Sequence, residues 1–103
     1  MSELPLPPQT RRLGASGIAI SPLAWGMWRF AESGRTAAEA ARLVHAALDS
    51  GITLLDTADI YGFDGSGGFG DAETLLGEVL AGEPGLRDHM ALATKGGILT
   101  PLP

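Results

Sequence analysis

A helix pattern that leads directly into an apolar run, between Thr36 and Asp56, constrains the fold more than any other feature of the sequence. Thr36 and Glu39 have the T-x-x-E spacing of a capping box, which satisfies free backbone N–H groups at a helix start. Apolar residues then recur at helical spacing and predict one apolar face: Ala40, Leu43, Val44, Ala47 and Leu48. Gly51 predicts the helix end, and the run ITLLD that follows is typical of a parallel strand covered on both faces.

The alternation of strand and helix patterns continues on both sides of this unit. Residues 23–28 are apolar and predict an earlier strand, and residues 90–94 (MALAT) predict a later one. Between them a second helix is expected over about residues 71–81, with Asp71 as its N-cap and Gly82 as its stop. Its apolar stripe comprises Leu75, Leu76, Val79 and Leu80. This order of elements predicts an α/β fold built from parallel βαβ units with right-handed crossovers.

The N-terminal part of the chain predicts a leader and a hairpin. Residues 1–10 contain three prolines and no apolar core segment, so we expect a loose leader that is neither a signal peptide nor a membrane span. The turn sequence GASG, from Gly14 to Gly17, separates Arg12-Leu13 from residues 18–20 and predicts a small hairpin. The organised part of the chain is therefore expected over residues 11–103.

Charge and cysteine content narrow the possible partners and the cellular compartment. The net charge is −5 and the 7 basic residues are scattered, which argues against a nucleic-acid or anionic-membrane partner. The absence of cysteine excludes disulfides and thiolate metal sites and fits a reducing compartment, so a cytoplasmic location is expected. His45 and His89 are interpreted as surface or packing residues rather than as metal ligands or catalytic groups.

The glycines Gly65, Gly67 and Gly70 spell the G-x-G-x-x-G pattern of a dinucleotide phosphate loop. In such a loop the first glycine follows its strand directly, whereas eight residues separate Asp56 from Gly65 here. The acid expected about 20 residues further on, which holds the ribose, is replaced by Lys95. The spacing therefore favours a flexible loop that connects strand to helix.

An acid, a phenol and an amine are expected at one edge of the sheet. Asp56 ends the second predicted parallel strand, Lys95 follows the third, and Tyr61 lies in the loop just beyond Asp56. Because active groups gather at the carboxyl ends of parallel strands that lie about 4.8 Å apart, the three side chains could converge. A phenol with a pKa of about 10 is a weak proton donor at neutral pH, and a nearby ammonium stabilises its phenolate. Each residue taken alone also fits a solvent-exposed or packing role.

In these segments the sequence resembles the aldo-keto reductase superfamily, NAD(P)H-dependent reductases built on a (β/α)8 TIM barrel. The resemblance rests on an ordered set of motifs: Arg12-Leu13-Gly14, Ser16-Gly17, Ser21-Pro22-Leu23, Gly26-x-Trp28, DTADIYG over residues 56–62 and ATKGG over residues 93–97. It implies that residues 11–103 form the N-terminal part of such a barrel, comprising a hairpin, about three strands and two helices.

The resemblance also implies an activity and a set of site residues. In the complete protein we expect NAD(P)H-dependent reduction of aldehydes or ketones to alcohols, with a small-molecule carbonyl substrate. Tyr61 is expected to be the general acid, with Lys95 and Asp56 as the residues that tune it. The cofactor is expected to be NADPH, with NADH not excluded. The residues expected to contact the cofactor are Gly26, Met27, Trp28 and Asp56, and no metal is expected.

The chain departs from the superfamily pattern in its length. A (β/α)8 barrel needs roughly 250 residues. The superfamily's catalytic histidine follows the fourth strand, which these 103 residues do not reach. The remainder of the barrel is therefore expected to be required, and residues 1–103 alone are expected to be inactive. The alternative is a non-catalytic cofactor-binding or regulatory subunit of the same fold.

Overall fold

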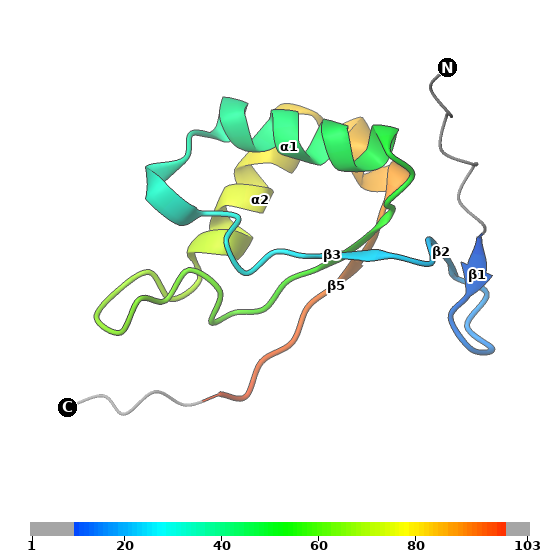
Figure 1. The fold of residues 1–103 in the computed structure, drawn as a ribbon, viewed down its shortest axis with the longest axis horizontal. Helices are drawn as coiled ribbons and strands as arrows, with labels where there is room; N and C mark the ends of the chain where they lie inside the picture. Colours follow the sequence, from blue (N-terminus) through cyan, green and yellow to red (C-terminus); the bar gives the residue numbers. More distant parts are fainter. Residues whose placement is uncertain (1–9, 99–103) are drawn as a thin grey trace, which may run out of the picture.

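The computed structural model describes residues 10–98, so nearly all of the predicted leader and the last five residues lie outside the described part. Figure 1 shows a small antiparallel hairpin beside a parallel sheet that two helices cover on one side. The elements are β1 (Arg11–Arg12), β2 (Ala19–Ile20), β3 (Ala24–Gly26), the 3-10 turn η1 (Glu32–Gly34), α1 (Ala37–Asp49), β4 (Leu54–Asp56), α2 (Asp71–Gly82), the 3-10 turn η2 (Pro84–His89) and β5 (Ala91–Ala93).

The sheet has the order β3-β4-β5, with both neighbouring pairs parallel. Leu54 of β4 pairs with Ala24 on one side and with Ala91 on the other, and the three strands end level with one another. Helices α1 and α2 form the crossovers between these strands. The predicted parallel βαβ arrangement is confirmed.

The predicted hairpin is also present. Strands β1 and β2 pair antiparallel, and the Leu13 N–H donates to the Ile18 carbonyl at 2.9 Å. Gly14 and Gly17 adopt φ values of 56° and 81°. Residues with a side chain disfavour this conformation, so the GASG turn requires glycine at both positions. The buried Ser21 then ties the end of the hairpin to the sheet, because its hydroxyl accepts a hydrogen bond from the Thr53 N–H at 2.9 Å.

Helix α1 has the capping that the sequence predicts. The Thr36 hydroxyl accepts from the Glu39 N–H at 3.1 Å, and the Glu39 carboxylate accepts from the Thr36 N–H at 2.9 Å. At the other end Gly51 adopts a φ of 88° and donates to the Leu48 carbonyl, while the Ile52 N–H reaches back to Ala47. These paired bonds form a Schellman motif, which closes the helix and directs the chain into β4.

Two details of the helices differ from the sequence-based expectations. Asp71 is the first residue of α2 rather than its N-cap, because Gly70 occupies the cap position with a φ of 91° and the Asp71 N–H is already bonded to the Gly68 carbonyl. On α1, Leu43 is 38% exposed although the helical spacing assigned it to the apolar face. It lies at the flank of that face, whose centre is formed by the fully buried Ala40 and Val44.

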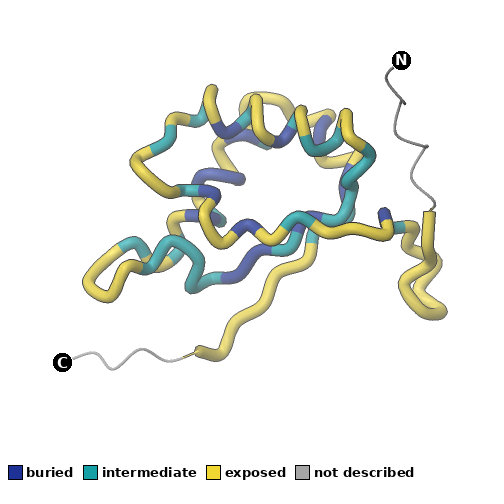
Figure 2. The backbone as a smooth tube through the Cα atoms, in the orientation of Figure 1, coloured by how far each residue is buried: buried dark blue, intermediate teal, exposed yellow. Residues whose placement is uncertain are grey.

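The hydrophobic core lies between the sheet and the two helices. Leu55, at the centre of β4, has no exposed surface and belongs to the same apolar cluster as residues of α1 and α2. Figure 2 shows the buried segments along the inner sides of the helices and the central strand. The other core residues are Met27, Phe30, Ala40, Val44, Ala72, Leu75, Leu76, Val79, Leu86 and Met90.

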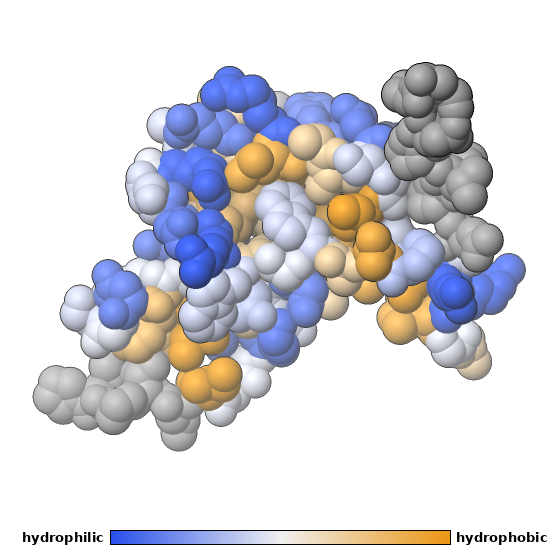
Figure 3. All heavy atoms as spheres, in the orientation of Figure 1, coloured by the Kyte–Doolittle hydropathy of each residue, from blue (hydrophilic) through white to orange (hydrophobic). Residues whose placement is uncertain are grey.

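The opposite side of the sheet is less covered. Ala24, Gly26 and Ala93 are exposed, and Leu54 is only partly buried. Polar residues cover much of the surface over α1 in Figure 3, whereas apolar residues reach the surface below it. No helix within residues 10–98 combines the length and the apolar character that crossing a membrane requires.

An exposed ion pair connects the C-terminal half of α1 to the residue that follows α2. The His45 Nε2 atom lies 2.9 Å from a carboxylate oxygen of Glu83, and this hydrogen bond, with the attraction of the carboxylate charge, raises the pKa of His45. A raised folded-state pKa means that the pair stabilises the fold fully below the unfolded-state pKa of about 6.5. That stabilisation is lost as the pH rises through the folded-state pKa.

Replacing His45 by Gln in the complete protein should therefore lower the melting temperature more at a pH of about 5.5 than at about 8.5, which lie on either side of the ordinary histidine pKa. Thermal unfolding of both proteins at the two pH values measures the difference. Glu83→Gln is the matched variant, since it removes the same pair from the other side and should give the same pH dependence. A difference that stays constant with pH would contradict the role of the pair.

Candidate active site

The candidate site lies at the carboxyl edge of the parallel sheet. Gly26, Asp56 and Ala93 are the last residues of their strands and stand in register across the sheet. The pairing continues beyond the strands, because the Asp59 N–H donates to the Lys95 carbonyl at 3.0 Å. The segments that follow β4 and β5 are therefore held side by side, and their side chains emerge at one edge.

The structure brings the three side chains of the predicted site together. The ammonium of Lys95 donates to the Asp56 carboxylate at 2.8 Å and to the Thr57 carbonyl at 3.0 Å. The same nitrogen lies 4.7 Å from the centroid of the Tyr61 ring, so its charge also faces the aromatic ring. The convergence that was expected from strand ends and loop spacing is thus present in the fold.

The electrostatics of this group keep the lysine charged. The hydrogen bond to Asp56, followed by the interaction with Tyr61, raises the pKa of Lys95. The side chains of Lys95 and Asp56 remain 52% and 41% exposed, so solvent screens the pair and its contribution to stability is small. The pair therefore orients a positive charge against the phenol ring without being needed for the fold.

The segment after β3 supplies a second aromatic ring. Trp28 is 61% exposed, and its ring meets that of Tyr61 edge-on, with the centroids 5.4 Å apart. Gly26 lies on the exposed side of the sheet, and a Cβ atom placed there would meet no atom within 4 Å. Met27, between them, has no exposed surface and belongs to the core. Gly26 and Trp28 thus present an open surface beside Asp56.

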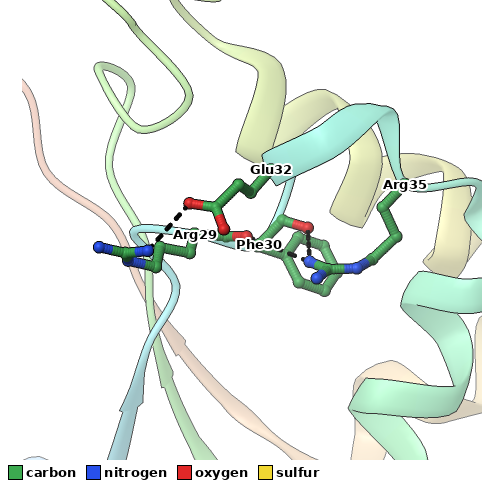
Figure 4. A network of polar contacts seen from close by, with 4 residues as sticks. All are labelled: Arg29, Phe30, Glu32 and Arg35. Carbon is green, nitrogen blue, oxygen red and sulfur yellow. Dashed lines mark hydrogen bonds and ion pairs between the residues drawn. The ribbon is translucent and has the colours of Figure 1, made fainter.

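A partly buried arginine, Arg35, holds this segment by hydrogen bonds that the sequence patterns did not indicate. Figure 4 shows the Arg35 guanidinium pointing at the backbone of the turn, where its Nη1 atom donates to the Arg29 carbonyl at 3.1 Å and to the Phe30 carbonyl at 2.5 Å. The Arg29 side chain pairs instead with Glu32 at 3.2 Å, in a position exposed to solvent. Arg35 therefore holds the turn that follows Trp28.

The glycine run lies in the loop between β4 and α2, as predicted. Gly62 and Gly68 cross so closely that a Cβ atom on Gly68 would lie 2.1 Å from the Gly62 carbonyl oxygen. The Asp64 carboxylate accepts hydrogen bonds from the Gly67 and Ser66 N–H groups, and these bonds lower the pKa of Asp64. The loop is thus closed by its own contacts, and these account for several of its glycines and for its acid.

The two histidines lie away from this edge. His45 belongs to α1 and pairs with Glu83, whereas His89 ends η2 immediately before Met90, at the amino end of β5. Among residues 10–98, no group of three or more His, Asp or Glu side chains could hold a metal ion. The side chains that meet at the carboxyl edge are instead those of Asp56, Tyr61 and Lys95.

Comparison with known proteins places these residues in context. Residues 22–101 match the model of the Aldo/keto reductase family. A 6-dehydroglucose reductase from Novosphingobium aromaticivorans is 78% identical over all of this chain and 34% of its own length. A 6-dehydroglucose reductase from Agrobacterium fabrum is 40% identical over 82% of this chain and 27% of its own length.

A solved structure gives the same result for the fold. The crystal structure of a protein described as an aldo-keto reductase from Pseudomonas aeruginosa superimposes with a TM-score of 0.68 at 35% identity, over 90% of this chain and 33% of that one. The predicted fold, part of a (β/α)8 barrel, is thereby confirmed. The chain thus spans between 27% and 34% of the length of these three proteins.

The role of Arg35 can be tested by hydrogen exchange in the complete protein. Arg35→Met removes the guanidinium that donates hydrogen bonds to two backbone carbonyls. We therefore expect the peptides that cover residues 27–34 to exchange several-fold faster, while the exchange of the β4 peptides stays unchanged. Arg42→Met, at an exposed position of α1, is the matched control and should leave this segment as it is. Unchanged exchange in the Arg35 variant would show that the turn does not depend on the guanidinium.

Proposed function

This chain belongs to the aldo/keto reductase family, and on that premise we propose that the complete protein reduces an aldehyde or ketone to an alcohol by hydride transfer from NADPH. The observation that carries the proposal is the contact of the Lys95 ammonium with the Asp56 carboxylate and the Tyr61 ring. Family membership alone would also suit a non-catalytic subunit, but such a subunit has no need of a cation held against a phenol. The activity is assigned to the complete protein rather than to residues 1–103 alone.

Each of the three side chains has a separate role in the proposed reaction. Tyr61 donates its phenolic proton to the carbonyl oxygen of the substrate as negative charge develops there. Lys95 stabilises the phenolate that remains, since its ammonium already lies against the ring. Asp56 holds the ammonium in place at 2.8 Å and favours its charged form. When bound, the nicotinamide cofactor supplies the hydride that reaches the carbonyl carbon.

The described residues fit the nicotinamide end of such a cofactor. The exposed edge beside Asp56 is flat at Gly26, where no atom lies within 4 Å of a Cβ position, so a planar ring can approach the backbone. Trp28 offers an exposed aromatic face beside it, and Asp56 offers a carboxylate to ribose hydroxyls. Met27 is proposed to support this contact from the core side, because it has no exposed surface.

The substrate is proposed to be a sugar that carries a carbonyl group at carbon 6. Support comes from the 6-dehydroglucose reductase that is 78% identical over the whole of this chain. NADPH is the proposed reductant. Rates of carbonyl reduction measured with NADH decide whether NADH is also accepted. We place the complete protein in the cytoplasm, in keeping with a chain that lacks cysteine.

Replacing Tyr61 by Phe tests the general acid directly. The variant keeps the ring that contacts Trp28 and Lys95 but loses the proton, so kcat for carbonyl reduction should fall by about 10² to 10⁴. The affinity for NADPH, measured by fluorescence titration, should stay within about twofold of the wild type, since the proton is needed only in the chemical step. Phe69→Leu, at an exposed position of the glycine-rich loop, is the control. Turnover near the wild-type rate would remove Tyr61 from the proposed mechanism.

A further inference from the structure

A second acid of the DTADIYG motif, Asp59, has no role in the mechanism above. It lies three residues beyond Asp56, in the segment that continues the pairing of β4 with β5. One of its carboxylate oxygens, Oδ1, is buried and has no hydrogen-bond donor among the described residues. Burying such an oxygen without a donor costs free energy, so a side chain that served only to fill this space would be better replaced by an apolar one.

The other carboxylate oxygen of Asp59 is placed against the residue that follows Lys95. A Cβ atom built on Gly96 would lie 2.8 Å from the Asp59 Oδ2 atom and 3.4 Å from its Cγ atom. The φ of Gly96 lies outside the left-handed region, so its backbone conformation does not require glycine. Gly96 is therefore explained by space, because the Asp59 carboxylate occupies the volume that a side chain would need.

Asp59 thus contacts the chain at two neighbouring points just beyond the Lys95 side chain. Its backbone N–H donates to the Lys95 carbonyl at 3.0 Å, and its carboxylate lies against Gly96. The Lys95 side chain leaves the backbone immediately before these two contacts and reaches Asp56 and Tyr61. A shift of the segment at this point would move the ammonium away from the ring, and small displacements of reacting groups are costly in catalysis.

We propose that Asp59 is a positioning residue for Lys95, and that Gly96 is the matching small residue that admits the Asp59 carboxylate. The proposal rests on the reductase function proposed above, because positioning matters only if Lys95 serves the reaction. Asp56 and Tyr61 contact the Lys95 side chain, whereas Asp59 acts through the backbone of residues 95–96, which we call the lysine segment. Asp59 itself has no contact with the reacting atoms in this assignment.

A double-mutant cycle in the complete protein tests the proposal, with Asp59→Ala, Gly96→Ala and the double variant. Each single change should lower kcat for carbonyl reduction by between about tenfold and a hundredfold, since each displaces the lysine segment. The Kd for NADPH should stay within about twofold of the wild type. The double variant should be no slower than Asp59→Ala, because the new methyl group then no longer meets a carboxylate. Asp88→Ala, an exposed acid of η2, is the control.

The outcomes separate this proposal from the function on which it rests. The positioning role is overturned, while the reductase assignment stands, if the fold losses of the two single variants multiply in the double variant. It is also overturned if the kcat of Asp59→Ala stays within about twofold of the wild type. A wild-type protein that reduces no carbonyl compound overturns the proposed function and the positioning role with it. If Asp59→Ala does not fold, Asp59→Ser takes its place in the cycle, because it also removes the carboxylate that meets Gly96, with the same expected loss and the same criterion of non-additivity.

Discussion

The parallel pairing of β4 with a strand on each side is the constraint on which the rest of this structure depends. Hydrogen bonds on both sides fix Gly26, Asp56 and Ala93 level with one another, and the register persists beyond the strands through the bond from Asp59 to the Lys95 carbonyl. Residues far apart in sequence are thereby brought to one edge by the backbone alone. The ladder therefore sets the edge, and the contacts of Lys95 with Asp56 and Tyr61 complete the candidate site there.

The alternation of side chains across the strands separates stability from chemistry. Leu55 points to the helices and is fully buried, whereas its neighbour Asp56 bonds Lys95 on the exposed edge. In the segment after β3, Met27 is likewise buried and Trp28 is exposed. The apolar cluster between sheet and helices stabilises the fold, and the exposed lysine–aspartate pair contributes little to it. Substitutions at the site can therefore change activity while leaving the core intact.

Local signals predicted much of this arrangement, and contacts between distant segments account for what was missed. The capping box at Thr36 and the glycine at Gly51 depend on a few neighbouring residues, so the limits of α1 could be predicted. The cap of α2 could not, because the left-handed Gly70 replaces the side chain of Asp71. Arg35 contacts the turn after Trp28, and Gly96 leaves space for the Asp59 carboxylate. Both contacts form only in the folded chain, so no periodic pattern of the sequence predicts them.

The central claim is that Lys95, held by Asp56, makes Tyr61 an effective proton donor. The most direct measurement is the single-turnover rate of carbonyl reduction by the complete protein and its Lys95→Met variant, both saturated with NADPH. The account predicts that the rate falls by about 10² to 10⁴ while the Kd for NADPH changes little. A Lys95→Met variant that turns over within about twofold of the wild type would contradict it.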